Sequence, residues 1–184
     1  MKKELINIGN KSKKAITSQL NSKKKNKVLK DYCDLIKKNK KLIINQNKKD
    51  IFNALKKGLK KNLIDRLILN EKKISNIISS IKSIIKLKDP TNIILEKWKR
   101  PNGLNISKIS IPIGVISVIY ESRPNVTSDV ASLCFKSGNA VILKGGKEAY
   151  NSNKILSELF KSSLRKNNID ENFVQFIDNK NRKV

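Results

Sequence analysis

The chain has 184 residues, with 41 Lys and Arg residues against 15 Asp and Glu residues and no histidine. This length fits one domain, or one domain with part of another. The missing histidine excludes Ser-His-Asp triads, Cys-His pairs, HExxH zinc sites and two-histidine iron sites, and two cysteines are too few for a structural zinc site.

The formal net charge is +26, and most of the basic excess lies in the first 100 residues. Such a charge is typical of nucleic-acid-binding proteins. However, Lys, Ile and Asn supply 86 of the 184 residues, and all three have A/T-rich codons, so an AT-biased genome accounts for the same enrichment. We therefore expect no specific nucleic acid partner, and a basic nucleic-acid-binding module is the less favoured alternative.

Neither a membrane span nor a secretory signal is predicted. The longest apolar stretch, residues 111–120, is interrupted by Pro112 and Gly114 and is far shorter than the ~20 residues that cross a bilayer. Cys33 and Cys134 lie too far apart in the sequence to suggest a disulfide framework. A reducing, cytoplasmic location is therefore expected.

Residues 1–92 are expected to form a helical region. Its clearest helix spans 70–87, where isoleucines recur at three- and four-residue steps along one face. Asn70 is predicted to cap this helix, and Asp89 before Pro90 is predicted to end it, because the residue before a proline avoids the α region. The other predicted helices cover residues 2–20, 24–45, 48–57 and 62–69.

Residues 93–111 are expected to form a β-hairpin. The turn signal Pro101-Asn102-Gly103 stands between two apolar flanks. The apolar residues that follow the turn alternate as in a strand, but the alternation slips near Lys108, which suggests a β-bulge.

Residues 112–184 are expected to form the first half of a doubly wound parallel sheet. Continuous apolar strands joined by helical crossovers are typical of a parallel sheet that is covered on both faces. The predicted fold class is therefore α/β, with N-terminal helices, a hairpin and a βαβαβ unit. The predicted strands are 115–120, 140–143 and 173–177, and the predicted helices are 127–136 and a segment from Asn151 or Ser152 to about 166.

Two polar segments, 121–125 and 144–148, follow the first two of these strands. Ligands of open α/β sheets bind beyond the carboxyl ends of the strands, where both segments are expected to lie. Gly145 and Gly146 would let a ligand approach the backbone, and Glu148 would accept from ribose hydroxyls. A G-x-G-x-x-G motif is missing after the first strand, so the spacing alone gives a weak signal for a dinucleotide.

The motifs of the chain resemble those of one enzyme family. They are P-I-G-V-I-S-V-I-Y-E-S-R-P-N-V-T-S-D-V-A-S-L-C at 112–134, K-S-G-N-A-V-I-L-K-G-G-K-E at 136–148, F-I-D-N at 176–179 and I-D-R-L at 64–67. These runs are similar to the gamma-glutamyl phosphate reductases, or glutamate-5-semialdehyde dehydrogenases, of the aldehyde dehydrogenase superfamily. The similarity runs along the whole chain but covers somewhat less than half of the family's length.

The resemblance implies reduction of L-glutamate 5-phosphate to L-glutamate 5-semialdehyde and phosphate with NADPH, in proline biosynthesis. A cysteine thiolate attacks the acyl phosphate, and hydride from the nicotinamide reduces the thioester. The family's nucleophile lies in a segment beyond Val184, whereas Cys134 matches a non-catalytic position and is expected in the core. The chain alone is therefore expected to be inactive, and a non-catalytic truncated remnant is the alternative.

The resemblance also assigns roles to single residues. Lys144 and Glu148 match the pair that holds the adenosine ribose, Lys144 with Lys147 would suit the 2′-phosphate of NADPH, and the backbone of 120–122 would lie along the cofactor. No metal site is expected. The full set of expected cofactor contacts is Tyr120, Glu121, Ser122, Lys144, Gly145, Gly146, Lys147 and Glu148.

On the substrate side, Arg123 is expected to bind the phosphate or carboxylate of L-glutamate 5-phosphate. Asn125 matches the residue whose amide stabilises the oxyanion, although its place before a helix equally suits an N-cap.

By the same resemblance, the chain divides into a helical region at 1–92, a hairpin at 93–111 and the first half of an NADPH-binding domain at 112–184, without the catalytic cysteine domain. The hairpin, at 98–111, resembles the superfamily's oligomerisation ribbon, which implies a homo-oligomer.

Overall fold

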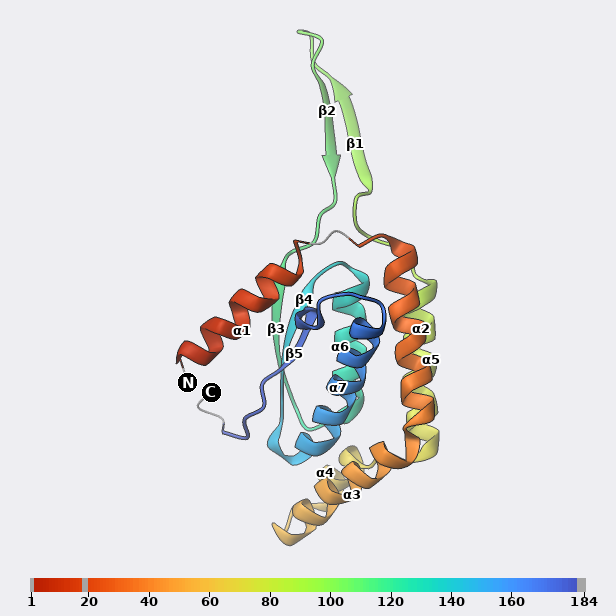
Figure 1. Cartoon of the computed structure of the whole chain (residues 1–184), viewed down its shortest axis with the longest axis vertical. Coiled ribbons are helices and arrows are strands. Elements are labelled where there is room, and N and C mark those ends of the chain that lie inside the picture. The colour runs from red at the N-terminus through yellow and green to blue at the C-terminus, as the bar shows by residue number, and fades with distance from the viewer. Residues whose placement is uncertain (1, 18–19, 182–184) are drawn as a thin grey trace.

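The computed structural model describes residues 2–17 and 20–181 and has an α/β body from which a two-stranded ribbon extends (Figure 1). Helix α1 covers one face of a three-stranded sheet, α6 and α7 cover the other face, and α2 and α5 pack outside α6 and α7. The helices are α1 (Lys2–Ala15), α2 (Ser22–Lys38), α3 (Lys40–Lys56), α4 (Lys61–Leu67), α5 (Glu71–Lys86), α6 (Pro124–Lys136) and α7 (Tyr150–Lys166), with 3₁₀ turns η1 (Lys147–Ala149) and η2 (Glu171–Phe173). The strands are β1 (Ile94–Lys99), β2 (Asn105–Ile109), β3 (Val115–Tyr120), β4 (Ala140–Gly145) and β5 (Val174–Phe176).

Strands β3, β4 and β5 form the parallel sheet in that order. Their apolar runs suit this position because helices lie against both faces of the sheet. The register places Val115 beside Ala140 and Tyr120 beside Gly145. The polar segments that follow Tyr120 and Gly145 therefore leave the sheet at the same edge. The α/β class and the βαβαβ unit predicted from the sequence are confirmed.

One hydrophobic core joins the N-terminal helices to the sheet. Val28 and Ile36 of α2 are completely buried in it. The ring of Tyr32, also on α2, lies 4.6 Å from the ring of Phe160 on α7. The Tyr32 hydroxyl donates to the Leu156 carbonyl at 3.1 Å, so this polar atom is satisfied inside the core. The helices before the ribbon and the sheet after it thus form a single packed body.

The predicted single helix at 24–45 is wrong, because the chain turns at Asn39 between α2 and α3. The lysine-rich run 37–41 has no apolar side chain, so the stripe that holds α2 against the core ends there. Asn39 Nδ2 donates to the Leu35 carbonyl at 2.8 Å and satisfies one of the last carbonyl groups of α2. Helix α3 then continues through the separately predicted helix at 48–57.

Two other helix predictions concern the ends of α5 and α1. Asn70 caps α5 as predicted, since its side chain accepts a 2.8 Å hydrogen bond from the Lys73 backbone amide. The predicted helix at 2–20 is shorter, because α1 ends at Ala15. Residues 18 and 19 of that prediction lie outside the described residues.

Strands β1 and β2 form the antiparallel hairpin predicted at 93–111. The turn between them contains Gly103 at φ +86°, a conformation that favours glycine. The register shifts between Ile94 and Glu96, opposite Lys108. The irregularity predicted near Lys108 is therefore present, and the extra residue lies on the facing strand.

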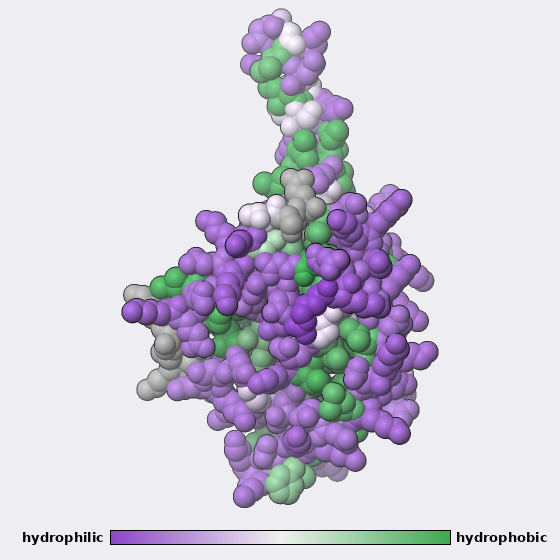
Figure 2. Space-filling model, in the orientation of Figure 1, coloured by the Kyte–Doolittle hydropathy of each residue, from purple (hydrophilic) through white to green (hydrophobic). Residues whose placement is uncertain are grey.

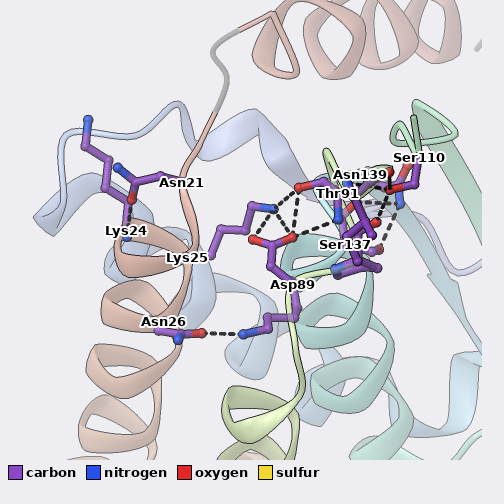
Figure 3. A network of polar contacts seen from close by, with 12 residues as sticks. Asn21, Lys24, Lys25, Asn26, Asp89, Thr91, Ser110, Ser137 and Asn139 are labelled. Carbon is purple, nitrogen blue, oxygen red and sulfur yellow. Dashed lines mark hydrogen bonds and ion pairs between the residues drawn. The ribbon is translucent and has the colours of Figure 1, made fainter. Parts of the chain in front are cut away.

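A buried ion pair fixes the base of this ribbon (Figure 3). Lys25 on α2 is only 1% exposed, and its ammonium group lies 2.9 Å from the carboxylate of Asp89. The same ammonium donates to Thr91 Oγ1 at 3.1 Å. Just after β2, the Ser110 hydroxyl donates to the Pro90 carbonyl at 2.6 Å. Both ends of the hairpin are thereby tied to one another and to α2.

The face of the body drawn in Figure 2 is largely hydrophilic, whereas hydrophobic side chains lie along the ribbon. The exposed large apolar residues of the ribbon are Ile93, Ile94, Leu95, Trp98, Leu104, Ile109 and Ile111. In the part of the chain that the structure describes, no helix combines the length and the apolar character needed to cross a membrane.

Candidate functional site

A cavity of about 670 Å³ lies beyond the carboxyl ends of β3 and β4. It brings together every residue predicted to contact cofactor or substrate except Asn125. One wall comes from β3 and the loop after it, and a second comes from β4 and η1. A third wall comes from α4 and from Leu59, which precedes α4 in the chain. The lining residues are Leu59, Leu63, Arg66, Leu67, Ile119, Tyr120, Glu121, Ser122, Arg123, Lys144, Gly145, Gly146, Lys147, Glu148, Lys180 and Asn181.

Tyr120 is fixed in the cavity wall by a chain of polar contacts. Its hydroxyl lies 2.7 Å from Thr127 Oγ1, and Thr127 donates to Asn153 Oδ1 at 3.0 Å. Burial raises the pKa of Tyr120 to about 12, against the opposing effect of the hydrogen bond with Thr127. The phenol therefore stays neutral near pH 7, and Tyr120 forms part of the cavity wall.

Gly145 and Gly146 let the end of β4 approach its neighbours closely. A Cβ atom on Gly145 would lie 2.2 Å from Asn153 Nδ2, and one on Gly146 would lie 2.1 Å from Ser122 Oγ. Protein side chains thus fill the space that a Cβ would take at both positions. Packing within the protein is therefore one reason for glycine at both positions, and the approach of a ligand to their backbone stays a prediction.

The loops after β3 and β4 are joined by the Ser122 hydroxyl, which donates to Glu148 Oε2 at 2.5 Å. Lys144 is held from a third direction, because its ammonium group donates to the Asn179 carbonyl after β5. Burial lowers the pKa of Lys144. A lysine ammonium has three N–H donors, so Lys144 keeps two for another acceptor.

Exposed ion pairs lie at the rim of the cavity. A carboxylate oxygen of Glu121 lies 3.7 Å from the guanidinium of Arg66 and 3.9 Å from that of Arg123. Exposed pairs of this kind contribute only about 0–1 kcal/mol. Both arginine side chains can therefore turn toward an incoming anion at little cost.

Asn125 does not line this cavity. Helix α6 begins at Pro124, earlier than the predicted 127–136, because the fixed φ of proline suits the first helical turn. Arg123 is the N-cap residue, so the interpretation of Asn125 as an N-cap is wrong. The exposed Asn125 amide donates to the Asp129 carboxylate at 3.2 Å, one turn further along.

The third wall of the cavity was not predicted from the sequence. Leu63, Arg66 and Leu67 of α4 line it, although 62–69 was interpreted only as a helix. The I-D-R-L motif at 64–67, which carries part of the resemblance, was the one sequence signal for these residues. Because α4 and β3 lie far apart in the sequence, no local pattern predicts that they line the same cavity. Lys180, after β5, was missed in the same way.

Helix α3 fixes the start of α7, beside the second wall. Asp50 is 2% exposed and accepts from the backbone amides of Asn151 at 3.0 Å and Ser152 at 2.8 Å. Asn47 donates to Ser152 Oγ at 3.0 Å and to the Leu67 carbonyl at 2.8 Å. Two buried polar side chains of α3 therefore tie the α4 wall to the segment that follows η1.

Neither cysteine lines the cavity. Cys33 and Cys134 are buried and carry free thiols. Burial raises the pKa of Cys33 to about 11 and also raises the pKa of Cys134, so both thiols stay protonated near pH 7. Within residues 2–17 and 20–181, no three His, Cys, Asp or Glu side chains gather as metal ligands.

The architecture is that of an aldehyde dehydrogenase-like protein, over part of its length. An acetylating aldehyde dehydrogenase from Geobacillus thermoglucosidasius matches with a TM-score of 0.71 at 12% identity, over 98% of this chain and 37% of that one. An aldehyde dehydrogenase structure from Bacillus subtilis matches with a TM-score of 0.68 at 15% identity, over 95% of this chain and 36% of that one. At these identities the likeness shows the fold alone.

The particular similarity is to gamma-glutamyl phosphate reductase, whose N-terminal part this chain resembles. The Thermotoga maritima structure matches with a TM-score of 0.95 at 37% identity, over 98% of this chain and 44% of that one. The Sulfurihydrogenibium relative is 46% identical over 97% of this chain and 40% of its own length, and the Aquifex aeolicus relative 43% identical over 98% and 41%.

These matches confirm the resemblance carried by the sequence motifs, and they imply a nicotinamide cofactor for the class. No family model matches the chain. The chain spans about 40% of the length of the curated relatives that it matches.

Proposed function

We propose that this chain forms the cofactor-binding part of an NADPH-dependent enzyme that reduces L-glutamate 5-phosphate to L-glutamate 5-semialdehyde and phosphate, in proline biosynthesis. The observation that carries the proposal is the cavity in which the loops after β3 and β4 meet. The similarity to gamma-glutamyl phosphate reductases supports the same reaction. When bound, NADPH supplies the hydride.

In this proposal Glu148 and Lys144 hold the adenosine ribose. The Glu148 carboxylate, positioned by Ser122, accepts from the ribose 3′-hydroxyl, because the 2′ oxygen of NADPH carries the phosphate. The two remaining donors of Lys144 are available to the same sugar. Lys147 is assigned to the 2′-phosphate, which distinguishes NADPH from NADH. The backbone from Tyr120 to Ser122, with Glu121 between them, lies along the cofactor. Gly145 and Gly146 keep the second loop close to the first.

Arg123 and Asn125 are assigned to the substrate. The Arg123 guanidinium binds the phosphate or carboxylate in a bidentate manner, and its weak pairing with Glu121 leaves it able to turn. The exposed Asn125 amide, at the start of α6, donates to the oxyanion that develops on the acyl carbon. Both assignments place the reacting end of the substrate beside the first turn of α6.

The proposed reaction needs a thiolate, which neither cysteine of this chain supplies. Cys33 and Cys134 are buried, protonated and outside the cavity. We therefore assign the nucleophile to polypeptide outside these 184 residues. The chain by itself is expected to bind the cofactor without turning over the substrate.

We also assign the ribbon, residues 93–111, to contact with a second copy of the chain. Its exposed apolar residues, among them Trp98 and Ile109, support this role. Sedimentation velocity is expected to show a dimer or larger assembly that Trp98→Glu weakens, and a strictly monomeric chain would contradict it. The free thiols suit a reducing cytoplasm.

Two measurements test the function. Fluorescence titration of the 184-residue chain with NADPH tests cofactor binding, and saturable binding is expected. Mixing the chain with the separately expressed remainder of the Thermotoga maritima relative tests the reaction, and NADPH oxidation that depends on L-glutamate 5-phosphate is expected only in the mixture. Binding without activity in the mixture would favour a non-catalytic remnant, and absence of binding would refute the cofactor assignment.

A further inference from the structure

A second cavity, of about 220 Å³, adjoins the first. Lys147, Glu148 and Lys180 line both of them, so the two cavities meet at these residues. The rest of the smaller cavity comes from the end of α3 and the start of α7. Those lining residues are Asp50, Asn53, Ala54, Lys57 and Asn151. Since a water molecule takes up roughly 30 Å³ in the liquid, this space can hold a phosphate group together with several waters.

Three lysines line the smaller cavity. Within the described ranges, the side chains of Lys57 and Lys147 form neither an ion pair nor a hydrogen bond. The Lys180 ammonium lies 4.4 Å from the centre of the Tyr150 ring, a cation–π contact, and forms no ion pair with a carboxylate in the part of the chain that the structure describes. Ammonium groups that share one cavity without a carboxylate partner repel each other, and a bound anion relieves that repulsion.

The two carboxylates of the smaller cavity are already engaged by donors. Asp50 Oδ1 accepts from the Asn151 backbone amide, and Oδ2 accepts from the backbone amide and hydroxyl of Ser152 at 2.8 and 2.7 Å. Glu148 Oε2 accepts from the Ser122 hydroxyl. The charge that stays available to a ligand in this cavity is therefore positive.

We propose that the smaller cavity binds the 2′-phosphate of the dinucleotide, and that Lys57 and Lys180 determine, with Lys147, the preference for NADPH over NADH. This inference rests on the proposed function, because it needs the adenosine ribose at Glu148. Glu148 lies where the two cavities meet, so a group on the 2′ oxygen enters the smaller cavity while the rest of the nucleotide occupies the larger one. A phosphate monoester carries about −1.5 to −2 charge at pH 7, which the three ammonium groups complement.

Titrations with 2′,5′-ADP and 5′-AMP test the inference, since these nucleotides differ only in the 2′-phosphate. In the 184-residue chain, Lys57→Gln and Lys180→Gln are each expected to weaken 2′,5′-ADP binding roughly tenfold, as for the loss of one charge-assisted hydrogen bond, and to leave 5′-AMP binding unchanged. Lys48→Gln is the matched control. Lys48 is exposed on α3 and lies two and a half turns from Lys57, on the opposite face.

Selective loss of 2′,5′-ADP binding in both cavity variants supports the inference. Equal losses for both nucleotides, or losses no larger than in Lys48→Gln, overturn the phosphate assignment and leave the proposed function standing. If the unmodified chain binds neither nucleotide nor NADPH, the proposed function fails as well. Circular dichroism of each variant verifies that the fold is unchanged.

Discussion

The Ser122 hydroxyl donates a 2.5 Å hydrogen bond to the Glu148 carboxylate, although a helix and a strand separate the two residues in the sequence. Ser122 belongs to the loop after β3, and Glu148 lies in η1 after β4. The contact joins two walls of the larger cavity and fixes the carboxylate that we assign to the ribose. Hydrogen bonds to charged groups contribute about 1.5–3 kcal/mol.

Ser122→Ala is therefore expected to weaken NADPH binding about tenfold, because Glu148 loses the donor that orients it. The dissociation constant, measured by fluorescence titration, checks this. Ser79→Ala, on the exposed surface of α5, provides the control and is expected to change nothing. An unaltered constant for Ser122→Ala would mean that Glu148 does not hold the cofactor in this geometry.

Gly145→Ala is expected to destabilise the fold by about 1–3 kcal/mol, because the new methyl group would lie 2.2 Å from the buried Asn153 amide. Urea unfolding measures this change. Gly9→Ala is the matched control, since a Cβ at Gly9 meets nothing within 4 Å and Ala favours a helix over Gly. Gly9→Ala should therefore stabilise the chain by up to about 1 kcal/mol. Equal effects at the two positions would contradict the close packing at Gly145.

Asp89→Asn is expected to lower the free energy of unfolding by about 3–5 kcal/mol at pH 7, because the buried Lys25 ammonium loses its countercharge. The exposed pair of Glu96 and Lys108 provides the control, and Glu96→Gln should cost about 0–1 kcal/mol. Chemical denaturation at constant pH measures the free energy of unfolding of both variants and so compares the buried pair with the exposed one.

The same pair predicts a pH dependence. Burial acts to raise the pKa of Asp89, but hydrogen bonds from Lys25 and Thr91 outweigh it and hold the pKa below its ordinary value. A lowered folded-state pKa gives stability that is present above the unfolded-state pKa, about 3.9, and is lost as the pH falls through the folded-state value. The unmodified chain should lose this contribution below about pH 4, and Asp89→Asn should lack that part of the acid-induced loss. If the unmodified chain and Asp89→Asn lost stability in parallel as the pH falls, the assignment of this pH dependence to Asp89 would be contradicted.

Asp50→Ala is expected to reduce both stability and cofactor affinity. The substitution leaves the first amides of α7 without their acceptor, at a cost of about 1–3 kcal/mol, and releases the segment after Glu148. Thermal unfolding and NADPH titration measure the two effects. Asp65→Ala, which removes an exposed carboxylate on α4, should change neither. A stability loss with full NADPH affinity would show that α3 does not position the binding site.

Much of the fold follows from local patterns. The apolar run at 115–120, with Ser117 as its one polar residue, forms β3 with the predicted bounds, and Asn70 caps α5, because both signals act within a few residues. The break at Asn39 was missed, since asparagine and lysine occur inside these helices as well as at their ends and so do not mark a boundary. The contribution of α4 was missed because tertiary packing, which no local pattern encodes, brings Arg66 to Glu121.

The candidate site divides in the same way. The residues after β3 and β4 could be predicted, since the carboxyl ends of neighbouring parallel strands must meet. Asn47 and Asp50 gave no signal, because in a chain rich in Asn and Lys a buried polar pair is indistinguishable from solvated surface residues. Lys57, the residue that follows the last turn of the same helix, gave no signal for the same reason.

The most direct test of the proposed function is calorimetric titration of NADPH into the 184-residue chain and into its Glu148→Ala variant. We expect saturable one-site binding by the unmodified chain, roughly tenfold or more weaker binding by Glu148→Ala, and no change in Glu71→Ala, an exposed carboxylate on α5. A folded chain that shows no saturable NADPH binding, or one whose affinity is the same with and without the Glu148 carboxylate, would contradict the proposal.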